Sequence, residues 1–214
     1  MQTEGIIKYK CENQLMEVVT ELMIADINLI RTLLFDLKSI GIDYRESVDG
    51  IGFGNISKRI MNNQFVISGS GTGAKRILAA KDFSIVVNCD IQNNFLHSKG
   101  LCNASSESLS HFAVYNSLKN INFVIHIHNF ELWNFWKNKT PTTAQNAQYG
   151  TPEMANSIID CVKQFNETQE PKAVVMGGHI EGMLFFGEDL ATTFRLILDF
   201  LNALNNSKIK NEKT

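Results

Sequence analysis

The stretch FVIHIHNF, residues 123–130, sets two histidines inside an otherwise apolar, β-branched run. Its composition and its period of two predict a strand. Because alternate residues of a strand point to the same face, His126 and His128 are expected to project together, with the isoleucines beside them on the opposite face. Two imidazoles on one strand face suit two ligands of a zinc-like ion, and they suit two histidines on a solvated face about equally.

A third ligand would be needed for a catalytic metal site, and His179 is the candidate. It follows KAVVMGG at 172–178, which predicts a buried strand, and functional side chains gather at strand ends in α/β folds. The two glycines before it would let the backbone pass close to a ligand. The alternative is a turn histidine. We expect His97 at the surface and His111 as a structural partner on a helix.

The stretch ASSES, residues 104–108, offers hydroxyls and a carboxylate at the start of a helix predicted over 104–120. The simpler interpretation is a helix cap, with Ser105 or Ser106 capping and Glu107 favouring the positive end of the dipole. The alternative is an anion site, because hydroxyls and free N–H groups at a helix start suit a phosphate. These residues alone favour the cap.

Glycine-rich loops offer a second kind of site. GSGTGA at 69–74 formally satisfies G-x-G-x-x-G/A, lies between a predicted strand and a predicted short helix, and has Asp90 at the end of the next strand. A dinucleotide site is therefore an alternative, although the span is short for a strand–helix–strand unit of about 30 residues. Hydroxyls at Ser68, Ser70 and Thr72 suit a phosphate monoester at least as well. GFGN at 52–55 is another place for close approach to an anion.

Strands and helices mix along the whole chain, so the predicted class is α/β or α+β. No linker or repeat divides residues 1–214, which predicts a single domain with a flexible tail at 206–214. The other predicted elements are one long or two short helices over 13–39, a hairpin over 55–68 turning at Asn62-Asn63, a strand at 83–90, a helix at 151–166 with Pro152 in its first turn, a strand pair within 179–190 and a closing helix from 190.

Composition excludes several partners. The net charge of −2 argues against nucleic acid and anionic membranes. Cysteines 11, 89, 102 and 161 form no C-x-x-C pair and are expected as free thiols in a reducing compartment. The N-terminus lacks the apolar core of a signal peptide, and no apolar run approaches the roughly 20 residues that span a bilayer. A cytoplasmic protein is expected.

The order and spacing of these motifs resemble the class II aldolase/adducin family over about residues 15–200. The matching motifs are GNIS at 54–57, ISGSG at 67–71, SSE at 105–107, HIH at 126–128, YGTPEMA at 149–155 and the histidine at 179. The spacing from Glu107 to His126 is similar to that of bacterial L-fuculose-phosphate aldolases.

This resemblance implies a site and a fold. His126, His128 and His179 match the zinc ligands, and Glu107 matches the acid/base. The positions that hold a substrate phosphate match Gly54, Asn55, Ser70, Gly71, Ser105 and Ser106. The implied fold is a three-layer α/β/α arrangement around a mostly antiparallel central sheet, and the implied assembly is a fourfold-symmetric homotetramer with active sites at its interfaces.

The implied function is a zinc-dependent lyase (an aldolase) that cleaves a small phosphorylated ketose through a metal-stabilised enediolate, with Mn²⁺, Fe²⁺ or Co²⁺ as other metals. The same site set serves phosphosugar 4-epimerases and methylthioribulose-phosphate dehydratases. Asn146 stands where the aldolases carry a tyrosine, and the tail SKIKNEKT has none, so these alternatives stay open. A non-catalytic adducin-like scaffold and, as the least favoured, an NAD-binding oxidoreductase are the alternatives of other classes.

Overall fold

An eight-stranded sheet forms the centre of the molecule in the computed structural model, which describes residues 6–43, 50–165 and 172–211. The strand order is β1-β7-β6-β5-β4-β8-β10-β9, and every neighbouring pair is antiparallel except β1 with β7. The strands are β1 Lys10–Gln14, β4 Asn55–Met61, β5 Gln64–Ser68, β6 Phe83–Asp90, β7 Phe95–Gly100, β8 Phe123–His128, β9 Lys172–Val175 and β10 Gly182–Gly187; β2 Gly41–Asp43 and β3 Ile51–Phe53 form a separate pair.

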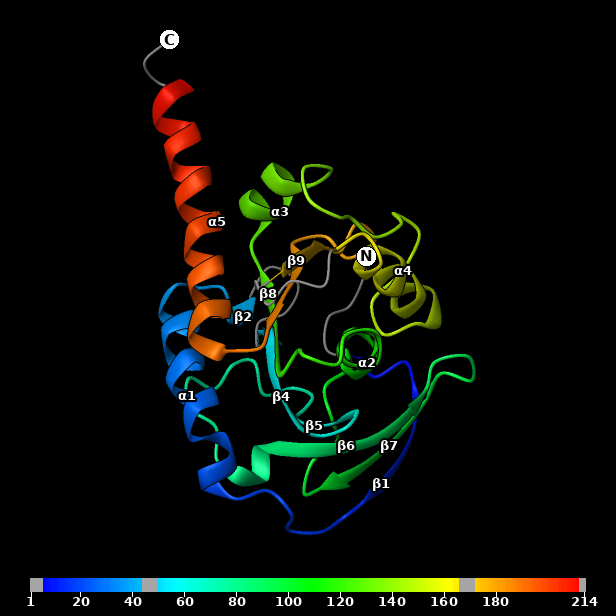
Figure 1. Ribbon diagram of the computed structural model, residues 1–214. Helices are drawn as coiled ribbons and strands as arrows, with labels where there is room; N and C mark the ends of the chain where they lie inside the picture. The colour runs from blue at the N-terminus through cyan, green and yellow to red at the C-terminus, as the bar shows by residue number, and fades with distance from the viewer. Residues whose placement is uncertain (1–5, 44–49, 166–171, 212–214) are drawn as a thin grey trace.

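Helices cover both faces of this sheet. They are α1 Glu21–Asp36, α2 Ser108–Ser117, α3 Phe130–Trp136, α4 Pro152–Val162 and α5 Leu190–Asn211. The helices α1 and α5 lie on one side of the sheet, and α2 and α4 lie on the other (Figure 1). One hydrophobic core lies beneath each layer of helices. The three-layer α/β/α fold with a mostly antiparallel sheet is therefore confirmed.

The strand β8 lies between β4 and β10 and decides which face carries the histidines. Val124 packs in the core beneath α2 and α4, whereas Ile125 and Ile127 pack in the core beneath α1 and α5. The predicted alternation is thus confirmed, and His126 and His128 share the α2/α4 face. All six residues of β8 are buried, so the interpretation as a solvated face is wrong.

Two predicted helices differ in the structure. The helix predicted over 13–39 begins only at Glu21, because residues 10–14 pair with β7 as strand β1. The short helix predicted after GSGTGA is not formed. Between β5 and β6, all of which the structure describes, the one helical segment is the 3-10 turn η1 at Ala80–Asp82. The Arg31 side chain binds carbonyls of this loop that helical hydrogen bonds would use.

The sheet excludes the dinucleotide-binding unit at this loop. β5 and β6, the strands on either side of GSGTGA, are antiparallel neighbours, whereas that unit needs two parallel strands joined by a helix. Asp90 is exposed and accepts hydrogen bonds from Asn93 within the β6–β7 turn. The NAD-binding alternative is therefore wrong on the geometry of its only motif.

Several other expectations can be compared with the structure. The hairpin is confirmed as β4 and β5, with Asn62 at φ 52° in its turn. The strand pair expected in 179–190 is a turn followed by β10 alone, and residues 206–211, expected in a flexible tail, belong to α5.

His97 is half-buried in β7 rather than at the surface, and all four cysteines are free thiols. Among the described residues, no helix combines the length and apolarity of a membrane span.

Candidate metal centre

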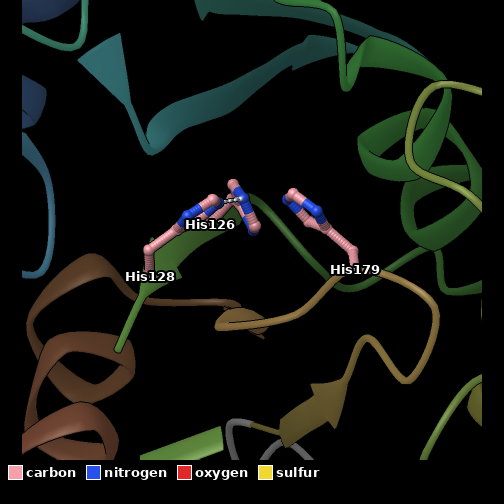
Figure 2. Close-up of side chains that lie close together, drawn as sticks. All are labelled: His126, His128 and His179. Carbon is pink, nitrogen blue, oxygen red and sulfur yellow. Dashed lines mark hydrogen bonds between the residues drawn. The ribbon is translucent and has the colours of Figure 1, made fainter. Parts of the chain in front are cut away.

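Three buried imidazoles converge on the α2/α4 face of the sheet. His126 and His128 project from β8, and His179 reaches them from the turn between β9 and β10 (Figure 2). The Nε2 atoms of His126 and His128 are 2.8 Å apart, and one nitrogen from each of the three rings lies within 4.8 Å of the others. The predicted ligand set is thus brought together by the fold.

A backbone carbonyl determines which nitrogen of His126 faces the cluster. The Nδ1 atom of His126 lies 3.2 Å from the carbonyl oxygen of Met183. A carbonyl only accepts hydrogen bonds, so it favours the tautomer of neutral His126 in which Nδ1 carries the proton and Nε2 presents its lone pair. This arrangement is the usual support of a metal-bound histidine, whose other ring nitrogen donates to a carbonyl or carboxylate.

Glycines allow His179 to approach. A Cβ atom at Gly182 would lie 2.5 Å from Cδ2 of His179 and 3.1 Å from Cε1 of His126. Gly177 and Gly178, expected to pass close to a ligand, instead pass close to the segment 143–147: Cβ atoms there would lie 2.2 and 2.0 Å from carbonyl oxygens of that segment. These two glycines therefore position the turn by backbone packing.

The Glu107 carboxylate lies directly against the imidazoles. Its Oε2 atom is 2.8 Å from Nε2 of His126 and accepts a hydrogen bond of 2.9 Å from the Asn55 side-chain amide. Its Oε1 atom is 3.4 Å from Nε2 of His179 and accepts no hydrogen bond among the described residues. Asn55 reaches Glu107 because it pairs with His126 across the sheet.

Burial and neighbouring charges shift the pKa values of Glu107 and His179 in opposite directions. Burial alone would raise the pKa of the Glu107 carboxyl, but His126, His179 and His128 lower it well below its ordinary value. Burial lowers the pKa of His179 to about 4, against the opposing effect of Glu107. An ionised Glu107 and a neutral His179 are the forms that bind a metal cation.

The donor set fits a divalent cation. Three neutral imidazoles suit zinc and similar ions, and ligand nitrogens of a tetrahedral site with bonds of about 2.05 Å lie roughly 3.3 Å apart. The distances between ring nitrogens of the three histidines, from 2.8 Å to at most 4.8 Å, bracket that value. A buried carboxylate oxygen without a hydrogen-bond donor also favours a cation nearby.

The predicted phosphate positions lie next to this cluster. Ser70 donates its backbone N–H to the carbonyl of Asn103, and Gly69 forms a bridge with Ala104, so Ser70 and Gly71 lie beside the serines of SSE. The two glycine loops touch through their backbones, since a Cβ at Gly73 would lie 2.3 Å from the amide nitrogen of Phe53. Gly54, at φ 79°, leads into Asn55.

The helix cap predicted at SSE is only partly correct. The N-cap of α2 is Glu107 itself, without a side-chain cap hydrogen bond, while the Ser105 hydroxyl accepts the N–H of Glu107 at 3.3 Å. The carboxylate is thereby free to face the histidines instead of its own helix. His111, one turn later, is fully buried and bonded through Nδ1 to the Ser57 hydroxyl at 2.7 Å, as a structural partner.

Three more residues lie near the site; Tyr149 was a weak candidate for a proton donor or a packing residue in the sequence, and Lys8 and Arg31 were missed. The Tyr149 ring packs 5.0 Å from that of His179, and the Lys8 ammonium lies 3.8 Å above the Tyr149 ring. Arg31 holds the loop that carries Ser70 and Gly71. The sequence signal for Arg31 was its place as a charged residue among the apolar positions 24, 27 and 34 of the predicted helix. The sequence carried no such signal for Lys8.

This fold and this cluster define a class of protein. The family model of the Class II Aldolase and Adducin N-terminal domain matches residues 42–205. The chain belongs to the class II aldolase/adducin family.

Solved structures agree on the fold. An L-fuculose-1-phosphate aldolase from Thermus thermophilus superposes with a TM-score of 0.62 at 18% identity, covering 88% of this chain and 94% of that one. A second L-fuculose 1-phosphate aldolase superposes with a TM-score of 0.65 at 17% sequence identity, covering 92% of this chain and 89% of that one. YgbL from Klebsiella pneumoniae is described as a candidate aldolase, epimerase or decarboxylase. It superposes with a TM-score of 0.61 at 15% sequence identity, covering 88% of this chain and 89% of that one. Curated proteins gave no match.

Proposed function

We propose that this protein is a divalent-metal-dependent lyase of the aldolase type that cleaves a small phosphorylated ketose. The observation that carries the proposal is the contact of the Glu107 carboxylate with two of three convergent imidazoles, at 2.8 and 3.4 Å. A metal site and a proton-transfer group thus share one buried cluster. An adducin-like scaffold would have no need to keep a charged carboxylate buried beside three histidines.

His126, His128 and His179 would hold the metal, with Zn²⁺ as the first candidate. A divalent cation there supplies Lewis-acid stabilisation of negative charge on a substrate oxygen. The Met183 carbonyl favours the tautomer of neutral His126 that presents Nε2. The remaining chemistry is assigned to side chains of this chain.

Glu107 is the proposed acid/base at the carbon that gains negative charge. Asn55 donates to Oε2 and holds the carboxylate in one orientation, which leaves Oε1 as the atom available to accept or return a proton. Because the carboxylate is already oriented, little further conformational entropy is lost when it approaches the substrate carbon.

The remote end of the substrate would bind along the two glycine loops. Gly54, Asn55, Ser70, Gly71, Ser105 and Ser106 are the proposed phosphate-binding residues. Their hydroxyls and N–H groups donate to phosphate oxygens, and this binding energy fixes the reacting carbons beside Glu107. A phosphorylated substrate should therefore react far faster than its unphosphorylated form.

Metal content and turnover test the proposal together. We expect about one zinc or similar ion per chain, and its loss in the His126→Ala, His128→Ala double variant. Metal-loaded protein should release an aldehyde from one of a set of ketose 1-phosphates. Protein that retains no metal and binds no added zinc would contradict the lyase and favour the scaffold.

Replacement of the acid/base is the sharper test. Glu107→Gln should lower turnover about 10²- to 10⁴-fold, the usual contribution of general acid–base catalysis, with metal content unchanged. Glu153→Gln, an exposed carboxylate in the first turn of α4, is the matched control and should keep full turnover. Equal activity of the two variants would exclude the role of Glu107.

The second candidate is a phosphosugar 4-epimerase or dehydratase of the same family. Asn146 is exposed and stands where the aldolases carry a tyrosine, which favours a reaction without that side chain. Nuclear magnetic resonance of the products separates the candidates: an aldolase yields two fragments, an epimerase an isomer, and a dehydratase a product that has lost water.

A further inference from the structure

Arg31 is a buried charged side chain that forms no salt bridge with any residue in the described part of the chain. It is 0% exposed on the inner side of α1, between core residues Ile27 and Leu34. Its guanidinium donates only to backbone carbonyls: Nη2 to those of Thr72, Gly73 and Lys75 at 2.9, 3.0 and 2.7 Å, and Nε to that of Lys75 at 3.0 Å. Within the described residues, no carboxylate forms a salt bridge with it, and Nη1 has no hydrogen-bond partner.

The acidic group that interacts with Arg31 among the described residues is already engaged. Asp82 interacts electrostatically with Arg31, but its Oδ1 atom pairs with the Lys75 ammonium at 2.6 Å and its Oδ2 atom accepts the N–H of Ala79 at 3.0 Å. Burial lowers the pKa of Arg31 to about 10, so the guanidinium remains charged at pH 7. Arg31, Lys75 and Asp82 together carry a net positive charge beside the loop, and a buried charge is costly unless it is compensated.

The hydrogen bonds of Arg31 also orient the loop. The carbonyls of Thr72, Gly73 and Lys75 point at the guanidinium. The N–H groups of Gly71, Gly73 and Ala74 donate no hydrogen bond to any described residue. Free N–H groups of a glycine-rich turn donate to bound anions, and here Arg31 lies on the opposite, carbonyl side of the peptide groups that carry the Gly73 and Ala74 N–H.

We propose that Arg31 is the positioning and charge-setting residue of an anion subsite formed by residues 70–74, and that this subsite selects a doubly charged phosphate group. The inference deepens the proposed function and rests on its phosphorylated substrate. Arg31 lies on α1, outside residues 42–205 that match the family model. Its charge supplies what the hydroxyls and N–H groups of the subsite lack: a net attraction for a dianion, in a place where water screens little.

Phosphate titration with variants tests the role. Inorganic phosphate is titrated calorimetrically into the full-length protein with and without a chelator, so that binding at the metal is separated from binding at the loop. We expect the chelator-independent affinity to fall at least tenfold in Arg31→Gln and at most about threefold in Arg31→Lys, which keeps the charge and loses the planar fork. Arg76→Gln, the matched control, removes one exposed charge from the same segment and should change affinity less than twofold.

A second variant covers the case in which Arg31→Gln does not fold. Lys75 has a 53% exposed side chain, and Lys75→Gln frees Asp82 to offset Arg31 while leaving the hydrogen bonds of the loop intact. Phosphate affinity should fall about threefold or more relative to Arg76→Gln. A purely structural role of Arg31 predicts no change.

The outcomes are distinguishable. If the wild-type protein binds phosphate but Lys75→Gln and the folded Arg31 variants match Arg76→Gln, the role of Arg31 is wrong and the proposed lyase stands. If the wild-type protein binds no phosphate in the presence of chelator, both the subsite and the phosphorylated substrate are wrong, whatever its metal content.

Discussion

Gly182 lies against two of the three imidazoles and lets them approach each other. It begins β10 opposite His128, and a Cβ atom at this position would point at the rings of His179 and His126. A side chain of any size would have to displace one of these rings. The metal centre therefore depends on a residue that carries no ligand atom.

Gly182→Ala should weaken metal binding without unfolding the protein. The added methyl would lie 2.5 Å from Cδ2 of His179 and must move that ring. We expect a 10- to 100-fold loss of zinc affinity, the range found when the support of a ligand is disturbed. Competition with a chromophoric chelator measures the affinity.

Gly41→Ala is the matched control for this substitution. Its added methyl would meet only the Phe53 ring at 3.6 Å, an ordinary contact. Zinc affinity of this variant should equal that of the wild type. Unchanged affinity in Gly182→Ala as well would mean that His179 is not a ligand.

At the scale of elements, α4 shows how a helix start supports the site. Thr151 is its N-cap: the hydroxyl accepts the N–H of Met154 at 3.3 Å and donates to the carbonyl of Gln148 at 2.7 Å. The residues between are Tyr149, which packs on His179, and Gly150 at φ 68°. The cap thus ties the helix to the segment beside the third histidine.

Thr151→Ala should lower the free energy of unfolding by about 1 kcal/mol, as loss of an N-cap usually does. Thr151→Ser keeps the hydroxyl and should remain within a few tenths of a kcal/mol of the wild type. Urea denaturation followed by circular dichroism measures both. Equal stability of the two variants would show that the hydroxyl contributes nothing.

For the whole molecule, buried neutral histidines make stability depend on pH. Burial lowers the pKa of His111 to about 3, while the unfolded chain has the ordinary value near 6.5. Between these values the unfolded state binds more protons, so the free energy of unfolding falls as the pH drops from about 6.5 to 3. His179, with its pKa lowered to about 4, acts in the same direction.

The slope of this acid destabilisation should depend on His111. One such group contributes up to about 1.4 kcal/mol per pH unit inside its window. His111→Asn should therefore show a smaller loss of stability between pH 7 and 4.5 than the wild type, measured on chelator-treated protein by chemical denaturation. An identical slope in the two proteins would mean that His111 is protonated in the folded state.

Much of the site was accessible from local sequence. Alternation along β8 placed His126 and His128 on one face, because the period of a strand is a local property of the chain. The hairpin, β6, α2, α4 and the strand before His179 follow from the same periodicities. Strand β1 does not, because its residues are extended only by pairing with β7, about 85 residues later in the chain.

The sequence by itself determined the kinds of groups available: three histidines and a carboxylate in strand and helix-start contexts, and glycine loops able to approach an anion. Tertiary structure alone decided their relation, since the distance from Glu107 to His126 and His179 depends on the packing of α2 against the sheet. It also replaced a short helix by a loop held on Arg31, because the hydrogen bonds of a buried guanidinium prevailed over local helix propensity. Periodicity is encoded residue by residue, whereas compensation of a buried charge involves groups that meet only in the folded chain.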